Sequence, residues 1–230
     1  MTEKQKIKLE LEKERIKGMR EFENGLVRET LGTALNTDVA TEDSVFMIAG
    51  IDEAGRGPLA GPVVAGACIL PADHDILYLN DSKKLSAKKR DMLFDQIKEE
   101  ALAWSVGLVD SARIDEINIL QATYEAMRLA ISQLKVPPTV LVNDAVTIPG
   151  IQIPQVPVIK GDAKCISIAA ASILAKVTRD RIMEEMDEKY PEYGFAKHKG
   201  YGTREHMDAI REFGPCPIHR RSFITRIVQG

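Results

Sequence analysis

Four acidic residues in this chain each follow the end of a predicted β-strand: Asp52, Glu53, Asp144 and Asp162. The strands are the apolar runs 45–51, 140–142 and 156–159. Because loops at the ends of strands converge in open α/β sheets, we expect these carboxylates to meet at one edge of a sheet. Taken singly, Asp162 could instead cap the helix that follows it, and Asp144 could make a turn.

Carboxylates that meet in this way repel one another unless cations share the site. Oxygen ligands without cysteine or histidine select Mg²⁺ or Mn²⁺ over zinc. Two such ions, roughly 3.5–4 Å apart, could activate a water and stabilise the leaving oxygen of a phosphodiester. The four acids therefore predict metal-dependent hydrolysis of a phosphodiester.

A glycine-rich turn follows the first two acids directly. Gly55, Arg56 and Gly57 precede Pro58, and after Pro62 the sequence continues as a β-branched strand. A dinucleotide-binding turn needs a helix at this point, so that interpretation fails. Glycines leave backbone N–H and C=O groups open to a sugar 2′-hydroxyl, and Arg56 could meet an adjacent phosphate. A plain tight turn is the alternative.

Charge is unevenly distributed along the chain. The net charge of −3 argues against a strongly basic nucleic-acid binder. The stretch 197–204 is nevertheless basic and contains Tyr201, and after Glu212 the charged residues are all arginines. Local basic patches of this kind can bind phosphates, and a solvated surface loop is the alternative.

Length and composition restrict the class of protein. A chain of 230 residues suits one domain, or one domain with a short appendage. No apolar run approaches the ~20 residues that cross a bilayer, and the charged N-terminus lacks the apolar stretch of a secretory signal. Cys68, Cys165 and Cys216 are odd in number and far apart, which fits neither a disulfide framework nor a zinc site. We expect a reduced protein of the cytoplasm.

The pattern of apolar residues predicts a mixed sheet flanked by helices. Further strands are expected at 63–70 and 104–109, and helices at 86–102, 119–134, 166–186 and 203–213, the last of these being the final helix. Residues 1 to about 30 are typical of a polar helix, and 32–44 of a linker. We expect two parts: a helical N-terminal extension with its linker (1–44) and a catalytic domain (45–230).

Several blocks of the sequence resemble the ribonuclease HII family, the type 2 ribonucleases H. The blocks are 51–58 (IDEAGRGP), 81–85 (DSKKL), 160–163 with 167–180, 198–203 (HKGYGT) and 219–223 (HRRSF). They occur in the family's order and extend roughly over residues 46–223. The resemblance implies a ribonuclease H-like α/β fold, with a mixed five-stranded sheet flanked by helices and, here, a short helical N-terminal appendage.

The resemblance also implies roles for individual residues. Asp52, Glu53, Asp144 and Asp162 would be catalytic and would hold two Mg²⁺ or Mn²⁺ ions. Gly55, Arg56 and Gly57 would read the ribose 2′-hydroxyl at an RNA–DNA junction, and Tyr201 would stack on the nucleotide there. Ser82, Lys83 and Lys84 would lie near the substrate backbone.

The implied activity is that of an endoribonuclease with a two-metal mechanism. It would hydrolyse the RNA strand of RNA–DNA hybrids and cut 5′ to single ribonucleotides embedded in duplex DNA, leaving 5′-phosphate and 3′-hydroxyl ends. Ribonucleotide removal and primer removal would be its tasks in DNA repair and replication. Its partners would be these nucleic acids and no membrane, and we expect a monomer.

Some positions depart from the family's pattern. Ala145 stands where a glycine usually follows the third acid, Asn143 precedes that acid, and Cys165 replaces a frequent serine. A thiol at a helix N-terminus could be nucleophilic, but no partnered histidine is evident nearby. The related ribonuclease HIII usually lacks the arginine between the two glycines and carries a larger N-terminal domain, so Arg56 favours ribonuclease HII.

Three other functions stay open at this point. A metal-independent ribonuclease would use histidines for acid–base catalysis, and the chain has four candidates: His74, His198, His206 and His219. A non-catalytic binding module for RNA–DNA hybrids is the second alternative, although a mere binder gains nothing from carboxylates that face phosphates. The third is a structure-specific DNA nuclease on a similar fold.

Overall fold

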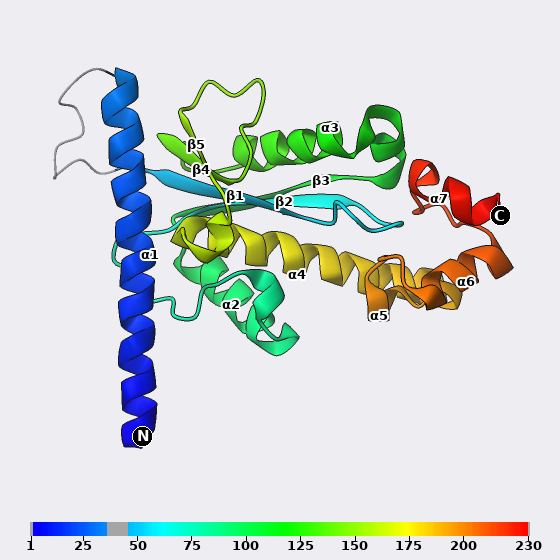
Figure 1. The fold of residues 1–230 in the computed structure, drawn as a ribbon, viewed down its shortest axis with the longest axis horizontal. Helices are drawn as coiled ribbons and strands as arrows, with labels where there is room; N and C mark the ends of the chain where they lie inside the picture. The colour runs from blue at the N-terminus through cyan, green and yellow to red at the C-terminus, as the bar shows by residue number, and fades with distance from the viewer. Residues whose placement is uncertain (1, 36–45, 230) are drawn as a thin grey trace.

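The structure is a computed structural model that describes residues 2–35 and 46–229. Its centre is a five-stranded sheet in the order β3-β2-β1-β4-β5 (Figure 1). The strands are β1 (Ile48–Ala54), β2 (Val63–Ile69), β3 (Ala103–Val109), β4 (Val140–Asp144) and β5 (Gln155–Val158). The first three strands are antiparallel, whereas β4 runs parallel to β1 and β5 runs parallel to β4. The expected mixed five-stranded sheet is therefore confirmed.

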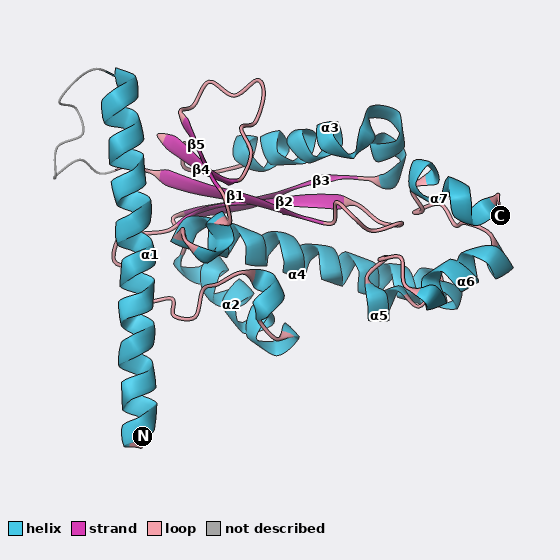
Figure 2. Ribbon diagram, viewed as in Figure 1, coloured by secondary structure: helices cyan, strands magenta, loops and turns pink. Residues whose placement is uncertain are grey.

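Helices cover both faces of the sheet, as Figure 2 shows. Helix α3 (Ser111–Ser132) packs on one face, where it buries Ala49 and Ile51 of β1. Helices α2 (Ala87–Glu100) and α4 (Ile166–Lys189) lie on the other face, with Ile173 and Leu174 in the core beside Cys68. Since side chains alternate along a strand, Ile51 and Asp52 point to opposite faces and Asp52 points toward the side of α4.

Helix α4 approaches the sheet unusually closely. A Cβ atom added to Gly50 would lie 2.0 Å from the backbone carbon of Ser167, and one added to Gly66 would lie 2.3 Å from the backbone oxygen of Ala171. Only glycine leaves room for this packing. The long helix is thereby held against β1 and β2 along the strands that lead to the acids.

The N-terminal helix α1 (Glu3–Leu35) lies across the edge of the molecule, and one end of it projects beyond the other elements (Figure 1). Val27 and Leu31 are buried against β4, β5 and the start of α4, while Ile16 and Met19 join the core beneath α4. The expected helical appendage is therefore confirmed. Residues 36–45, which include most of the predicted linker, lie outside the described residues.

The remaining elements are short, and the three helices among them lie at the end of the molecule opposite α1 (Figure 1). They are the 3₁₀ turns η1 (Ser82–Lys84), η2 (Gly161–Ala163) and η3 (Pro191–Tyr193), and the helices α5 (Phe195–His198), α6 (Arg204–Phe213) and α7 (Arg221–Val228). Tyr193, Phe195, Ile210 and Ile224 form a small apolar cluster of their own there. In the described part of the chain, no helix combines the length and the apolarity needed to span a membrane.

Two expectations about helices were wrong. The sequence placed the last helix at 203–213, but α7 follows it; the segment is only eight residues long and begins with arginine, and its buried residue is Ile224. Helix α3 begins at Ser111 instead of residue 119, since Asp110 caps about two extra turns and the backbone kinks at Asn118 (φ 67°). Ser86 caps α2 and Thr203 caps α6, each by accepting the backbone N–H three residues further on.

We predict opposite effects for alanine at two glycines. Gly66→Ala should destabilise the protein by about 3 kcal/mol, because the backbone of α4 would have to move away from β2. Gly18→Ala, on an exposed face of α1 with nothing within 4 Å, should stabilise it by roughly 0.5–1 kcal/mol through helix propensity. Urea unfolding of both variants measures this, and equal effects would contradict the close packing of α4.

Candidate active site

The four predicted acids come together at one end of the β1–β4 pair. Asp52 and Glu53 lie near the end of β1, and Asp144 ends β4. These strands are parallel neighbours with Ile51 opposite Asn143, so the next residues of each strand, Asp52 and Asp144, are adjacent. Asp162 lies in η2, directly before α4.

Asp144 connects this turn to the sheet. Its Oδ1 accepts a hydrogen bond of 2.7 Å from the backbone N–H of Gly161, which fixes the start of η2 beside the end of β4. Asp52 is only 7% exposed, and its Oδ1 accepts the N–H of Glu53 at 2.7 Å. Strand ends and a short turn therefore carry all four carboxylates.

The acids affect one another's protonation. Burial raises the pKa of Asp52 well above its ordinary value, and the negative charges of Glu53, Asp144 and Asp162 raise it further. Burial also raises the pKa of Glu53, which the nearby Arg56 opposes. The guanidinium of Arg56 lies 3.6 Å from the carboxylate of Glu53. The positive charges beside the cluster thus offset only part of its repulsion.

A fifth acid, Asp81, belongs to the same cluster and was not identified from the sequence. Burial raises the pKa of Asp162, and the charge of Asp81 and a hydrogen bond between the two side chains raise it further. Lys83 lies close enough to lower the pKa of both Asp162 and Glu53. The position of Asp81 directly before Ser82 in the DSKKL block was the one available signal.

The donor set fits a hard divalent cation, because it consists of buried or partly buried carboxylate oxygens that repel one another. Within residues 2–35 and 46–229, however, no three of these side chains already enclose a common point for an ion. Asp144 is bonded to Gly161, Glu53 faces Arg56, and Asp162 contacts Asp81. Cation binding would therefore exchange some of these protein contacts for contacts with the metal.

Two buried arginines support the glycine-rich turn from below. The guanidinium of Arg220 donates to the carbonyl oxygens of Gly55 (2.6 Å), Arg56 (2.9 Å) and Gly61 (3.0 Å). That of Arg179 donates to the carbonyl oxygens of Ala60, Pro62 and Lys199 at 3.0–3.1 Å.

The charge of these arginines is not neutralised locally. Both side chains are at most 1% exposed, and neither forms an ion pair with a described residue. Burial lowers the pKa of Arg220 to about 9, which leaves it charged at neutral pH. Two positive charges therefore lie directly beneath the turn, which the local sequence pattern did not reveal.

The predicted substrate-binding residues differ in exposure. Arg56 and Gly57 are exposed, whereas Gly55 is buried in a left-handed conformation (φ 97°). Tyr201 is 43% exposed, and its ring lies 3.9 Å from the position of a Cβ added to Gly57. The guanidinium of Arg179 lies 5.8 Å from the centre of that ring. The turn and the tyrosine thus form one continuous surface.

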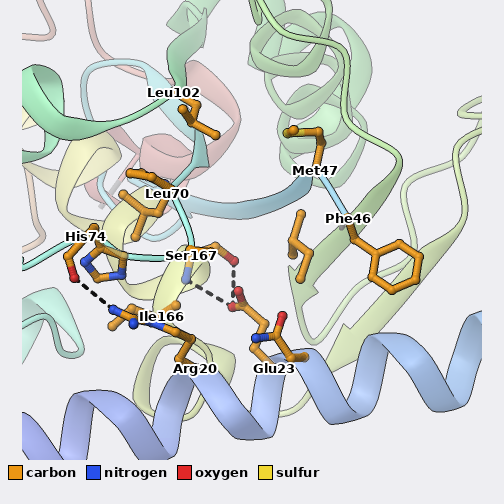
Figure 3. A pocket seen from close by; sticks show the side chains of 13 residues that line it. Arg20, Glu23, Phe46, Met47, Leu70, His74, Leu102, Ile166 and Ser167 are labelled. Carbon is orange, nitrogen blue, oxygen red and sulfur yellow. Dashed lines mark hydrogen bonds between the residues drawn. The ribbon is translucent and has the colours of Figure 1, made fainter. Parts of the chain in front are cut away.

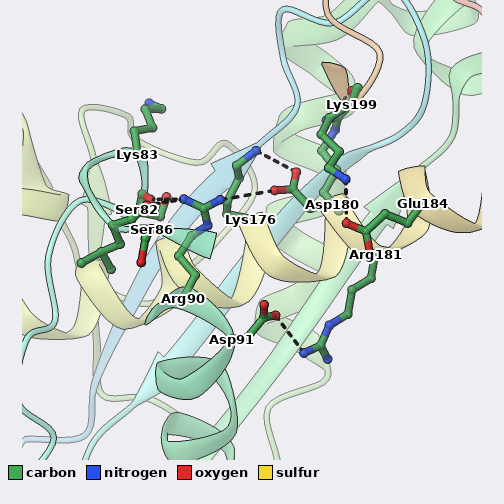
Figure 4. A network of polar contacts seen from close by, with 12 residues as sticks. Ser82, Lys83, Ser86, Arg90, Asp91, Lys176, Asp180, Arg181, Glu184 and Lys199 are labelled. Atoms are coloured by element: carbon green, nitrogen blue, oxygen red, sulfur yellow. Dashed lines mark hydrogen bonds and ion pairs between the residues drawn. The ribbon is translucent and has the colours of Figure 1, made fainter. Parts of the chain in front are cut away.

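The turn with Ser82, Lys83 and Lys84 is tied to α4 through α2 (Figure 4). Arg90 of α2 donates to the carbonyl oxygens of Ser82 (3.0 Å) and Leu85 (2.6 Å) and lies 3.9 Å from Asp180 of α4. Lys176 donates to the same Asp180 at 2.7 Å. The two lysines of the turn are exposed, whereas Ser82 is only 6% exposed, so the lysines are the accessible groups.

The candidate histidines and cysteine do not offer an alternative active site. Each of the four histidines is at most 8% exposed, and burial lowers the pKa of His74, His206 and His219 to about 4. Cys165 is fully buried, and its burial raises the pKa of the thiol to about 12. Groups so placed cannot reach a nucleic acid, which argues against histidine and thiol catalysis.

The histidines have a structural role beside Tyr201. His206 donates through Nδ1 to the carbonyl oxygen of Tyr201 at 2.9 Å, and its Nε2 lies 3.0 Å from Nε2 of His219. The other nitrogen of His219, Nδ1, accepts the N–H of Cys216 at 3.0 Å. This chain of contacts holds the backbone that presents Tyr201.

The departures around Asp144 have local explanations. Ala145 has φ 55°, a left-handed conformation that glycine adopts without strain, which accounts for the glycine usual at this position. Asn143 is fully buried and donates to the side-chain oxygen of Gln155 at 2.8 Å. Gln155 in turn bonds the N–H and C=O of Ile148, so Asn143 helps to hold the loop after Asp144.

Comparison with known proteins gives one consistent family. The sequence profile described as Ribonuclease HII matches residues 49–226. The chain is 65% identical to the ribonuclease HII of Lachnoclostridium phytofermentans over 180 residues, which is 78% of this chain and 71% of that protein. It is 50% identical to the ribonuclease HII of Caldanaerobacter subterraneus over 230 residues, which is 100% of this chain and 90% of that protein.

A solved structure supports the same grouping. The ribonuclease H2 of Pyrococcus horikoshii superposes with a TM-score of 0.66 at 31% sequence identity, covering 79% of this chain and 97% of that one.

We predict that Asp52→Asn stabilises the metal-free protein, and more so at high pH. The pKa of the Asp52 carboxyl is higher in the folded chain than in the unfolded chain, where it is near 3.8. The stability that Asp52 contributes is therefore fully present below pH 3.8 and is lost as the pH rises through the folded-state pKa. Asparagine removes this loss, so the difference in unfolding free energy between variant and wild type should grow from pH 4 to pH 8.

Urea unfolding in EDTA measures this difference. Asp95→Asn, at an exposed position of α2, is the control for exchanging a carboxyl for an amide, and it should change the unfolding free energy much less than Asp52→Asn does. A pH-independent difference for Asp52→Asn would show that the carboxyl is not buried among like charges.

Proposed function

Since the chain belongs to the ribonuclease HII family, and is therefore a ribonuclease H that acts on RNA paired with DNA, we propose that its acidic site hydrolyses the RNA strand of hybrids and cuts 5′ to single ribonucleotides in duplex DNA. The observation that carries the proposal is the convergence of Asp52, Glu53, Asp144 and Asp162 beside the exposed turn at Arg56. A binding module would gain nothing from buried carboxylates that repel phosphates.

Two divalent cations, Mg²⁺ or Mn²⁺, would be held by Asp52, Glu53, Asp144 and Asp162. Bound there, they would neutralise the acids, lower the pKa of the attacking water and stabilise the negative charge of the transition state. Asp52 is the most buried of the four and lies between Glu53 and Asp144, which suits the central position. Removing the cations would leave repelling carboxylates and an inactive site.

The proposed reaction is in-line displacement at the phosphate 5′ to the ribonucleotide. Water attacks phosphorus, the bond from phosphorus to the 3′-oxygen of the preceding nucleotide breaks, and that oxygen leaves with a proton. The products carry a 5′-phosphate and a 3′-hydroxyl. The ribose 2′-hydroxyl serves for recognition and not as the nucleophile, so no cyclic phosphate forms.

The turn at Gly55–Gly57 is suited to recognise that hydroxyl. The carbonyl oxygens of Gly55 and Arg56 already accept hydrogen bonds from Arg220. In the described part of the chain, the N–H groups of Arg56 and Gly57 have no backbone or side-chain acceptor. These N–H groups are therefore free to donate to the 2′-oxygen, while the charges of Arg220 and Arg179 attract the neighbouring phosphates.

Lys83, Lys84 and Tyr201 would complete the substrate surface. The exposed lysines would contact the backbone, and Tyr201 would stack on the nucleotide at the junction. We further propose that the protein acts as a monomer in the cytoplasm, where its three buried free cysteines need no oxidising environment. The N-terminal extension 1–44 and the catalytic domain 45–230 remain the proposed division of the chain.

Asp52→Asn should abolish cleavage, by a factor on the order of 10³ or more, while binding of the duplex is largely retained, because the loss falls on the metal-assisted step. The substrate is a DNA duplex with one ribonucleotide, incubated with Mg²⁺ or with EDTA. An all-DNA duplex is the control and should stay intact. Turnover in EDTA, cyclic phosphate ends or a cut in the all-DNA duplex would each refute the proposal.

Tyr201→Ala should change substrate preference more than stability. The side chain is 43% exposed, so its removal should cost less than about 1 kcal/mol of unfolding free energy. Loss of stacking should weaken binding of the junction by roughly 1–3 kcal/mol. Cleavage of the single-ribonucleotide duplex, compared with an all-RNA strand in a hybrid, measures the preference. A variant that is destabilised but keeps its preference would show that the ring is only a packed aromatic.

A further inference from the structure

The N-terminal helix reaches the start of α4 with a buried carboxylate (Figure 3). One oxygen of Glu23 accepts both the backbone N–H of Ser167, at 3.0 Å, and its hydroxyl, at 2.7 Å. Glu23 is only 5% exposed. The first N–H groups of a helix need acceptors, and the residue at the cap position of α4, Cys165, supplies no side-chain hydrogen bond. Glu23 therefore provides this cap from a distant part of the chain.

The start of α4 is joined to the acids by a short run of hydrogen bonds. The N–H groups of Lys164 and Cys165 both bond to the carbonyl oxygen of Gly161, at 3.0 and 2.7 Å. The N–H of Gly161 bonds to Asp144 at 2.7 Å. The turn with Asp162 is thus held between the end of β4 on one side and the capped end of α4 on the other.

Helix α1 also holds the segment that leads to Asp81. Arg15 donates to the carbonyl oxygen of Leu79 at 2.7 Å, and Glu12 accepts the N–H of Tyr78 at 2.8 Å. Tyr78 has φ 68°, a left-handed conformation that an ordinary side chain adopts only when its surroundings hold it. The segment then enters η1, beside which Asp81 contacts Asp162.

Helix α1 makes a third contact with the main body, between the contacts of Glu23 and those of Glu12 and Arg15. Arg20 donates to the carbonyl oxygen of His74 at 2.8 Å, at the wall of a cavity of about 80 Å³ (Figure 3). Nε of Arg20 and Nε2 of His74 are buried and have no partner among the described residues. A cavity of this size with unpaired nitrogen atoms fits ordered water rather than a ligand.

We propose that α1 is a positioning element of the metal site, in which Glu23 orders the turn of Asp162 through the cap of α4 while Glu12 and Arg15 order the segment before Asp81. The inference rests on the proposed function, because it takes the acids to be metal ligands. Groups that orient metal ligands from behind typically change metal affinity by roughly 10- to 100-fold when they are removed.

The protonation of Glu23 suggests the most informative substitution. Burial raises its pKa to about 7, although the hydrogen bonds from Ser167 and the charge of Arg20 oppose this. Near neutral pH the carboxyl is thus present in both forms, and each form has an oxygen that accepts from Ser167. Glutamine keeps such an oxygen and should therefore replace Glu23, whereas alanine should not.

The experiment is Mn²⁺ binding to the full chain by calorimetry, without nucleic acid. Glu23→Ala should weaken Mn²⁺ binding by about 10-fold, and Ser167→Ala, which keeps the backbone bond, by less. Glu23→Gln should stay within about 3-fold of wild type. Amide hydrogen exchange of residues 161–167 should be faster in Glu23→Ala than in Glu23→Gln.

Two controls separate positioning from stability. Val27→Ala makes a cavity under the same helix and should lower the melting temperature without changing Mn²⁺ affinity. Glu14→Gln removes an exposed charge of α1 and should change neither. If Glu23→Ala fails to fold, Ser167→Ala carries the test.

Unchanged Mn²⁺ affinity in Glu23→Ala, or in Ser167→Ala where the former does not fold, would overturn the inference and leave α1 as a cover for the core. Equal losses in Glu23→Ala and Val27→Ala would overturn it as well. Failure of the proposed function looks different, because the wild type itself would then bind no Mn²⁺ and cut no ribonucleotide-containing duplex.

Discussion

The mutual repulsion of buried carboxylates is the constraint on which the rest of this structure depends. The four acids would separate if their backbones were free to move, since burial and like charge both raise the cost of ionising Asp52, Glu53 and Asp162. Their backbones are strand ends and a turn tied to a long helix, and the glycines of β1 and β2 let that helix approach closely. The rigid sheet therefore keeps together groups that repel one another until protons or cations neutralise them.

The glycine-rich turn beside the acids lies over buried positive charge. Arg220 and Arg179 are buried and form no ion pair with any residue that the structure describes, and their guanidinium groups donate to backbone carbonyl oxygens. Negative and positive charge are thus built into adjacent parts of one site, each in a region of low dielectric constant where it acts over a longer distance. A phosphodiester strand matches this arrangement, because cations can bridge it to the acids while its neighbouring phosphates face the arginines.

Much of the site could be predicted because its residues mark strand ends and belong to contiguous motifs. The sheet, α4 and the grouping of the acids follow from such local signals. Other features depend on contacts between distant residues: Glu23 bonds a residue 144 positions away, and Arg220 one 165 positions away. No local pattern distinguishes those side chains from exposed charges on a helix or tail. Ala145 was predictable only in part. The sequence shows that it replaces the glycine usual at this position, but it does not show that the backbone there is left-handed.

The hydrogen bonds of the two histidines beside Tyr201 all run in a fixed donor-to-acceptor direction. Because Nδ1 of His206 donates to the carbonyl oxygen of Tyr201, its Nε2 must accept, and Nε2 of His219 must carry the hydrogen between the rings. Nδ1 of His219 then accepts from Cys216, so each ring is restricted to a single tautomer. An additional proton on His206 would place two N–H groups face to face. The segment that presents Tyr201 is therefore ordered by the arrangement of hydrogens on neutral rings, without any net charge.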